Sequence, residues 1–194
     1  MKEESKKVAE TKKQIKQAFF DLYATKKIEH ISIKEITDNA HLNRGTFYVY
    51  YRDIYDLLER TEDEIIEELV IMIQGVIPPL LRDADLSPFL PPVDFYQRNK
   101  KILQILLGPT GDPHFVHKIK GIVKDTVYEI FKREQIAPAK NMEYVIEYIA
   151  SAQIGIISYW MVEEDMALPV EELGEMVKEI ILHGPIEYLK PPER

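Results

Sequence analysis

Residues 43–51, NRGTFYVYY, place an arginine, several hydroxyl groups and four aromatic rings within nine positions. On a helix at about 100° per residue, Phe47 and Tyr51 share one side, which predicts that both are buried. An α-helix fits the major groove of DNA, where arginine pairs bidentately with guanine and hydroxyl groups bind phosphate oxygens. We therefore expect a DNA-reading face made of Arg44, Gly45, Thr46, Tyr48, Val49 and Tyr50.

The glycine in this segment supports that expectation. Gly45 stands in the first turn of a short helix, where glycine costs about 1 kcal/mol relative to alanine. Close approach to a partner is one reason for a residue without a side chain. The alternative is an internal aromatic cluster, which explains Phe47 and Tyr51 but not Gly45.

A second segment, GDPHFVH at 111–117, also carries residues that could do chemistry. Two histidines three residues apart on a helix bind a metal together with a carboxylate, so Asp112, His114 and His117 suggest a metal-dependent hydrolase as an alternative. Asp112 followed by Pro113 is equally an ordinary helix start. The sequence lacks a nucleophile elbow, a phosphate loop and a dinucleotide fingerprint. We expect no enzyme, no metal and no cofactor.

Two short helices must position the arginine-aromatic segment, and both have clear start signals. Ser32 and Glu35 form a capping box, so a helix is expected from Ile33 to about residue 40. Asn43 is a second cap, so the next helix starts at Arg44. Only His41 and Leu42 lie between them. Behind a longer helix over about residues 8–26, this arrangement is a helix-turn-helix.

The rest of the chain also has helical periodicity. Asp53 caps a long helix that should end where five prolines occur between residues 78 and 93. Further helices are expected at about 95–107, 113–134, 141–162 and 170–183. The predicted fold class is all-α, with a DNA-binding domain over residues 1–52 and a regulatory and dimerisation domain over 53–194.

The charge is unevenly distributed. The net charge is −8, yet residues 1–60 contain 12 basic and 10 acidic side chains, and the remainder contains 13 and 23. A mildly basic head suits phosphate binding, where Lys12 and Lys13 reach the flanking backbone. Ser32, Ile33 and Lys34 open a helix whose positive end favours phosphate. The chain contains no cysteine, and its longest apolar segment, residues 149–162, is interrupted by polar residues, so a soluble cytoplasmic protein is expected.

The segment ISIKEITDNAHLNRGTFYVYYRDIYDLLER, residues 31–60, resembles the DNA-binding head of the TetR family of bacterial transcription regulators. The resemblance covers about residues 11–59. The segment SAQIGIISYWMVEEDMALPVEELGEMV more loosely resembles the C-terminal domain of the branch that includes the dihydroxyacetone kinase regulators. Two positions depart from the family: His41 replaces a turn glycine and should have a positive φ, and Ile54 replaces a lysine that binds phosphate. The resemblance places Lys34 at a DNA-contacting position, together with Arg44, Gly45, Thr46, Tyr48, Val49 and Tyr50.

The resemblance also implies a repressor that binds a palindromic operator as a homodimer and is released by a small-molecule effector. Small residues along one helix permit close packing against the partner's copy. The expected dimer interface consists of Ser151, Ile154, Gly155, Ser158 and Trp160, with Ile157 beside them. The expected effector pocket is lined by Tyr96, Phe115, Tyr128, Tyr144 and Tyr159. The alternative keeps the fold as a DNA-binding or protein-interaction module without small-molecule control.

Overall fold

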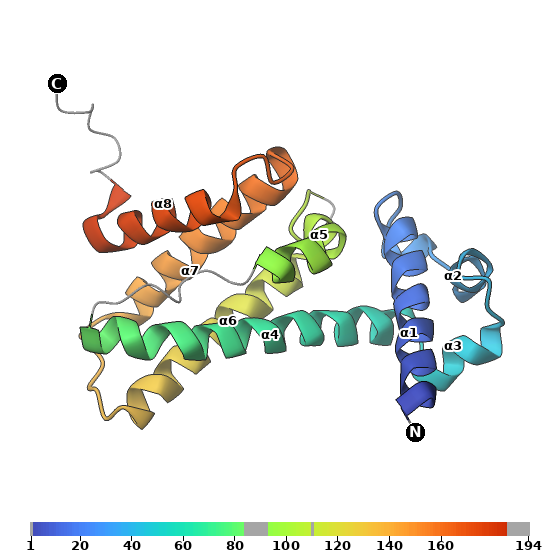
Figure 1. Cartoon of the computed structure of the whole chain (residues 1–194), viewed down its shortest axis with the longest axis horizontal. Coiled ribbons are helices and arrows are strands. Elements are labelled where there is room, and N and C mark those ends of the chain that lie inside the picture. Colours follow the sequence, from blue (N-terminus) through green and yellow to red (C-terminus); the bar gives the residue numbers. More distant parts are fainter. Residues whose placement is uncertain (1, 84–92, 110, 186–194) are drawn as a thin grey trace. The chain divides into compact units, whose positions relative to one another are not determined.

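The computed structural model describes residues 2–83, 93–109 and 111–185 (Figure 1). These residues form eight α-helices and contain no strand, which confirms the all-α prediction. The helices are α1 (Lys2–Tyr23), α2 (Ile33–Asn39), α3 (Arg44–Tyr50), α4 (Ile54–Asp83), α5 (Val93–Leu106), α6 (Pro113–Arg133), α7 (Met142–Ser158) and α8 (Val170–His183). A 3-10 turn (Ile28–His30) precedes α2, and a π-helical turn (Tyr159–Glu163) continues α7.

Most expected helix starts agree with the structure. The helices α2, α3, α6 and α8 begin at the expected residues, and the cap expected at Asp53 directly precedes α4. The first helix begins at Lys2, six residues before the expected start at Val8. Amphipathic periodicity locates the packed turns of a helix and carries no signal for its exposed, charged beginning.

The expected end of the long helix at Pro78 is wrong. α4 continues to Asp83 and contains Pro78 and Pro79. Proline lacks the backbone donor of a helical hydrogen bond, but its φ of about −65° is itself a helical value. The chain therefore stays helical through both prolines, at the cost of the missing hydrogen bonds. The remainder of the proline-rich segment, residues 84–92, lies outside the described residues.

The chain divides into two compact units. The first comprises residues 1–66 and 101–112, and the second comprises residues 67–100 and 113–194. The expected domain boundary at residue 52 stays a prediction, while by packing the first turns of α4 and the end of α5 belong with the first unit. The core of the first unit consists mainly of Ile15, Phe19, Phe20, Ile36, Phe47, Leu57 and Leu106, each at most 1% exposed.

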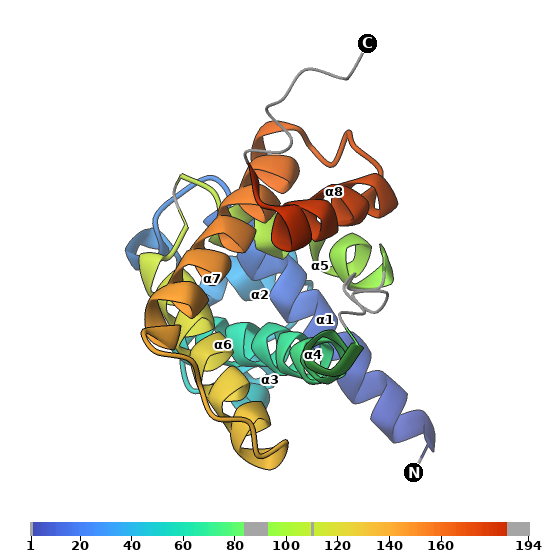
Figure 2. The same cartoon turned by 90° about the vertical axis from the view of Figure 1, so that its left-hand side faces the viewer.

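The second unit is built on the pairing of α6 with α7 (Figures 1 and 2). Val127 and Phe131 of α6 pack with Ile146 of α7 in one buried cluster. Near the π-helical turn, the rings of Tyr96 and Trp160 meet edge to face at 5.1 Å between centroids. The Trp160 indole N–H donates to the carbonyl of Leu168 at 2.7 Å, which attaches the loop before α8 to this core.

Candidate nucleic-acid interface

Helix α2 begins with the expected capping box. The Ser32 hydroxyl accepts the Glu35 N–H at 3.3 Å, and the Glu35 carboxylate accepts the Ser32 N–H at 2.9 Å. Lys26 donates to the other carboxylate oxygen at 2.6 Å. The Lys26 ammonium, followed by the Ser32 hydroxyl and N–H, lowers the pKa of Glu35 to about 2. The charged form of Glu35 thus stabilises the start of α2.

The turn after α2 is closed by a Schellman motif. The N–H of Leu42 donates to the carbonyl of Thr37 at 2.9 Å, and the N–H of His41 donates to Asp38 at 3.2 Å. This motif requires a left-handed residue, and His41 has φ 55°. The expectation of a positive φ at His41 is confirmed. Histidine tolerates this conformation better than most residues, although glycine adopts it without strain.

Helix α3 is anchored at its first turn by Asn43. Its side-chain oxygen accepts the Thr46 N–H at 2.8 Å and the Thr46 hydroxyl at 3.1 Å, which confirms the expected cap. A Cβ on Gly45 would lie 3.1 Å from this same oxygen. Glycine at position 45 thus has a local reason, because a side chain there would crowd the cap.

The two faces of α3 are divided as expected. Phe47 is fully buried and Tyr51, the residue that ends the helix, is 3% exposed. On the other side, Tyr48 is 59% exposed and Val49 is 73% exposed. This exposed side of α3 is therefore available to a partner.

The structure brings most of the other expected DNA-contacting residues to solvent near α3. Arg44 and Gly45 are exposed, whereas Thr46 and Tyr50 are half-buried. The Lys12 ammonium lies 5.9 Å from the centre of the Tyr50 ring, so α1 contributes a cation beside α3. Three further residues of this set are exposed on α1 or at the start of α2, namely Lys13, Ser32 and Lys34.

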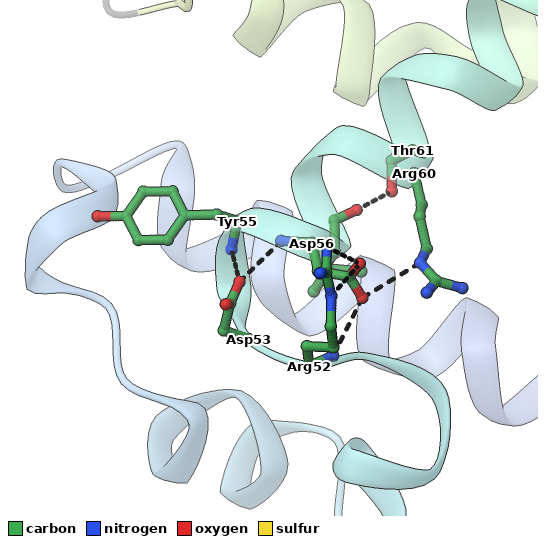
Figure 3. A network of polar contacts seen from close by, with 7 residues as sticks. Arg52, Asp53, Tyr55, Asp56, Arg60 and Thr61 are labelled. Atoms are coloured by element: carbon green, nitrogen blue, oxygen red, sulfur yellow. Dashed lines mark hydrogen bonds and ion pairs between the residues drawn. The ribbon is translucent and has the colours of Figure 1, made fainter.

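At the start of α4 the sequence predicted the Asp53 cap but not the pairing of Asp56 with two arginines (Figure 3). Asp53 caps the helix by accepting the N–H groups of Tyr55 and Asp56 at 2.9 and 2.8 Å. The carboxylate of Asp56 is only 4% exposed and is paired with the guanidinium groups of Arg52 and Arg60 at 3.0 and 3.1 Å. The signal that would have found these pairs is an aspartate, Asp56, with an arginine four residues before it and another four residues after it.

These contacts act on the ionisation of Asp56. The backbone N–H of Arg52 donates to its carboxylate at 3.0 Å. This bond, and then the Arg60 and Arg52 side chains, hold the pKa of Asp56 below its ordinary value, although burial acts in the opposite direction. The carboxylate therefore stays charged and orients both arginines.

The proposed metal ligands receive no support from the structure. His114 and His117 are both exposed on α6. In residues 2–83, 93–109 and 111–185 no group of three potential metal ligands lies close enough together to hold an ion. Pro113 is the first residue of α6, in keeping with the ordinary helix start that was the other interpretation of this segment.

Comparisons with known proteins agree with this architecture. Residues 89–183 match a TetR C-terminal family model, described as "Transcriptional regulator C-terminal region". An uncharacterized HTH-type transcriptional regulator, YxbF of Bacillus subtilis (strain 168), is 24% identical over 171 residues. Residues 89–183 therefore carry the C-terminal region of a TetR-family transcriptional regulator. The match covers 87% of this chain and 44% of YxbF, so the chain spans less than half the length of that curated relative.

Solved structures share the TetR fold. The dihydroxyacetone kinase operon activator DhaS is similar with a TM-score of 0.58 and 22% identity, over 89% of this chain and 94% of that one. A TetR-family regulator from Syntrophomonas wolfei is similar with a TM-score of 0.61 and 19% identity, over 89% and 93% of the two chains. At these identities the likeness concerns the fold.

The residues expected at the TetR dimer interface lie on α7 and its π-helical continuation. Ser151, Ile154 and Ser158 are half-buried and Gly155 is exposed, while Trp160 is 3% exposed and belongs to the core of its own unit. Sequence reasoning missed a more exposed apolar stripe on the first half of α7, which consists of Tyr144, Val145, Tyr148 and Ile149. A helical-wheel projection of α7 does not show which side of the helix packs against α6, so it could not identify the exposed side.

The five aromatic residues expected to line an effector pocket are not brought together. Tyr144 is 72% exposed on α7, whereas Phe115 is fully buried on α6. Tyr96 is also buried, with its ring packed edge to face against Trp160. Tyr128 packs against the α6–α7 cluster. Tyr159 alone of the five borders a cavity of about 390 Å³ lined by Gly155, Ile156, Tyr159, Trp160, Glu164, Leu168, Leu173 and Met176.

By length and composition only, the segment Met142–Glu163 is apolar enough to cross a membrane, a property that core helices of soluble proteins share. Only 22% of its most apolar window is buried within the chain. A partner helix and a bilayer are both environments that cover such a surface.

Proposed function

We propose that this TetR-family regulator binds a palindromic DNA operator as a homodimer through α3. The observation that carries the proposal is the division of α3 into a buried side and an open side. Phe47 and Tyr51 hold the helix in the core, which leaves Arg44, Tyr48 and Val49 free to enter a major groove. Arg44 reads a base edge, and the tyrosine hydroxyl groups and Lys12 bind the backbone.

The proposed dimer interface is the exposed side of α7. A single helix-turn-helix contacts too little DNA for specific binding, so two heads must be joined. Tyr144, Tyr148 and Tyr159 supply exposed aromatic area on this side, and Ser151 and Gly155 allow close approach of a partner helix. Pairing with a second copy would cover the apolar surface that the single chain leaves open. We further propose a cytoplasmic location, in keeping with this use of the apolar helix.

The proposed effector site is the cavity beside Tyr159. Its volume of about 390 Å³ suits a small organic molecule, and its lining is mainly apolar, with Ile156, Leu173 and Met176 among its residues. The helix α4 supplies residues to both compact units. An effector that favours one arrangement of the second unit would thereby bias the spacing of the two heads and release the operator, as in a repressor.

Selection from a random DNA pool tests the DNA-binding proposal. Purified protein should enrich a palindrome with half-sites about one helical turn apart, and binding should weaken steeply with salt. Replacing Arg44 with alanine should cost about 1 to 3 kcal/mol and relax one operator position. A pool with no enriched sequence would refute the proposal. An unchanged preference in Arg44→Ala would show that another residue reads that base.

The alternative, a regulator without small-molecule control, keeps the same DNA binding but has no effector bound in the cavity. Filling it with Met176→Trp, at a cavity-lining residue of α8 outside the proposed dimer interface, should abolish any effector response while leaving operator binding intact. If no compound from an apolar library shifts the melting temperature of the wild-type protein more than that of Met176→Trp, the module without an effector is the better description.

A further inference from the structure

Arg52 lies directly after α3, and its guanidinium is bound to the carboxylate of Asp56. The DNA-reading face described above does not include it. Tyr51 has an extended backbone, with φ −136° and ψ 141°, and its ring is buried. Successive side chains of an extended segment point to opposite sides, so Arg52 points away from the core. Its side chain is 77% exposed although it is bound to Asp56.

The bond to Asp56 fixes the guanidinium without using all of its donors. Nε of Arg52 lies 3.1 Å from Oδ1 of Asp56, and a terminal nitrogen lies 3.0 Å from the same oxygen. A guanidinium carries five N–H donors in a planar fork. The three that Asp56 does not engage stand on an exposed group. A donor held in this way loses less conformational entropy when it binds an anion than a free arginine would.

The local charge leaves Arg52 suited to an anion. Asp56 carries one negative charge and is shared by Arg52 and Arg60, so this trio has a net charge of +1. The neighbouring carboxylate of Asp53 accepts two N–H groups in the first turn of α4, where the helix dipole offsets its charge. Because Asp53 occupies these N–H groups, this helix start offers them to no external phosphate, and the guanidinium of Arg52 is the donor that faces outward.

We propose that Arg52 binds a DNA phosphate beside the groove that receives α3, and that Asp56 is the positioning residue that aims it. The proposal rests on the proposed DNA-binding function. A guanidinium held at one carboxylate and open on its remaining edge matches a phosphate oxygen pair in geometry and charge. The contact carries no base information, so it contributes equally to operator and unrelated DNA.

Arg60 provides a matched control for this proposal. It pairs with the same carboxylate at 3.1 Å and is 53% exposed, but it lies a further turn along α4, about 6 Å beyond Asp56 along the helix axis. Replacing either arginine with glutamine removes one charge and one partner of Asp56. The two variants should therefore lose similar stability, and only the variant at position 52 should lose a DNA contact.

The test is the salt dependence of DNA binding, measured by fluorescence anisotropy on the selected operator and on an unrelated duplex. Each phosphate contact contributes about 0.9 to the slope of log K against log salt. Arg52→Gln should weaken binding to both duplexes by the same factor and reduce the slope by about that amount. Arg60→Gln should keep the wild-type slope. Arg52→Lys should keep most of the slope and bind several-fold more weakly, because an ammonium lacks the planar fork.

Asp56→Asn tests whether Asp56 acts by positioning the Arg52 guanidinium or only through its negative charge. This substitution makes the site more positive, so a role in the overall field alone predicts tighter binding. Loss of positioning predicts weaker binding to both duplexes. An unchanged slope in Arg52→Gln, equal losses in Arg60→Gln, or tighter binding by Asp56→Asn would overturn the inference. Absence of any DNA binding by the wild-type protein would instead refute the proposed function.

Discussion

Gly45→Ala separates two reasons for a glycine in the recognition helix. The first reason is local, since a Cβ at position 45 would lie 3.1 Å from the Asn43 oxygen that caps the helix. The second is the close approach of DNA. The two reasons predict different results when the cap is removed, because Asn43→Ala eliminates the local conflict and leaves the approach to DNA unchanged.

The expected magnitudes follow from the geometry. Alanine is favoured over glycine within a helix by about 1 kcal/mol, and loss of an Asn cap costs about 1 kcal/mol. In the wild-type background the crowding of Asn43 offsets most of the gain, so Gly45→Ala should change the free energy of unfolding by a few tenths of a kcal/mol. In the Asn43→Ala background it should stabilise by close to 1 kcal/mol. The coupling energy between the two sites is thus expected to be about 0.5 to 1 kcal/mol.

The wild-type protein, Gly45→Ala, Asn43→Ala and the double variant form a double-mutant cycle. Urea unfolding of these four proteins, at one protein concentration, measures the coupling energy. Operator binding by the same four proteins tests whether DNA approaches the backbone at position 45. If DNA approaches the backbone at position 45, Gly45→Ala should weaken binding at least tenfold in both backgrounds. Equal operator affinity of Asn43→Ala with and without Ala at position 45 would refute the close-approach reasoning, and additive stabilities would refute the crowding of the cap.

Three further outcomes are expected. Phe47→Ala should lower the free energy of unfolding by about 3 to 5 kcal/mol, whereas Val49→Ala on the open side of α3 should change it by less than about 0.5 kcal/mol, both measured by urea unfolding. Because the pKa of Glu35 is lowered from 4.5 to about 2, its stabilisation is complete above the unfolded value and is lost as the pH falls toward 2; Glu35→Gln should flatten the pH dependence of the unfolding free energy in this window, and parallel profiles would contradict the assignment. Tyr148→Arg should shift sedimentation equilibrium toward the monomer, while Ile71→Arg, at a residue 69% exposed on α4, should not.

The head was predictable in detail because its signals are local. Caps at Ser32 and Asn43 depend on residues three positions apart, and the structure has the expected bonds at both. The positive φ of His41 was expected because His41 stands where the family that the sequence resembles has a turn glycine. The split of α3 followed from the position of Phe47 and Tyr51 on a wheel.

The C-terminal part was less predictable because aromatic residues with the same helical spacing are buried in some helices and exposed in others. Tyr144 and Phe115 were grouped as pocket residues, yet one is exposed and the other is fully buried. Periodicity places a residue on one side of its own helix and does not tell which neighbour covers that side. Trp160 shows the same limit, since its burial depends on Tyr96 and on the carbonyl of Leu168.

The sequence alone therefore determined the helical class, the helix-turn-helix and the inner and outer sides of α3, since each depends on contacts within a few residues. Only the tertiary structure decided that α4 continues through Pro78 and Pro79, that α7 keeps a tyrosine-rich side open, and that Asp56 holds Arg52 and Arg60. These features depend on whether residues distant in sequence cover a surface, and on the burial that makes one carboxylate the partner of two arginines.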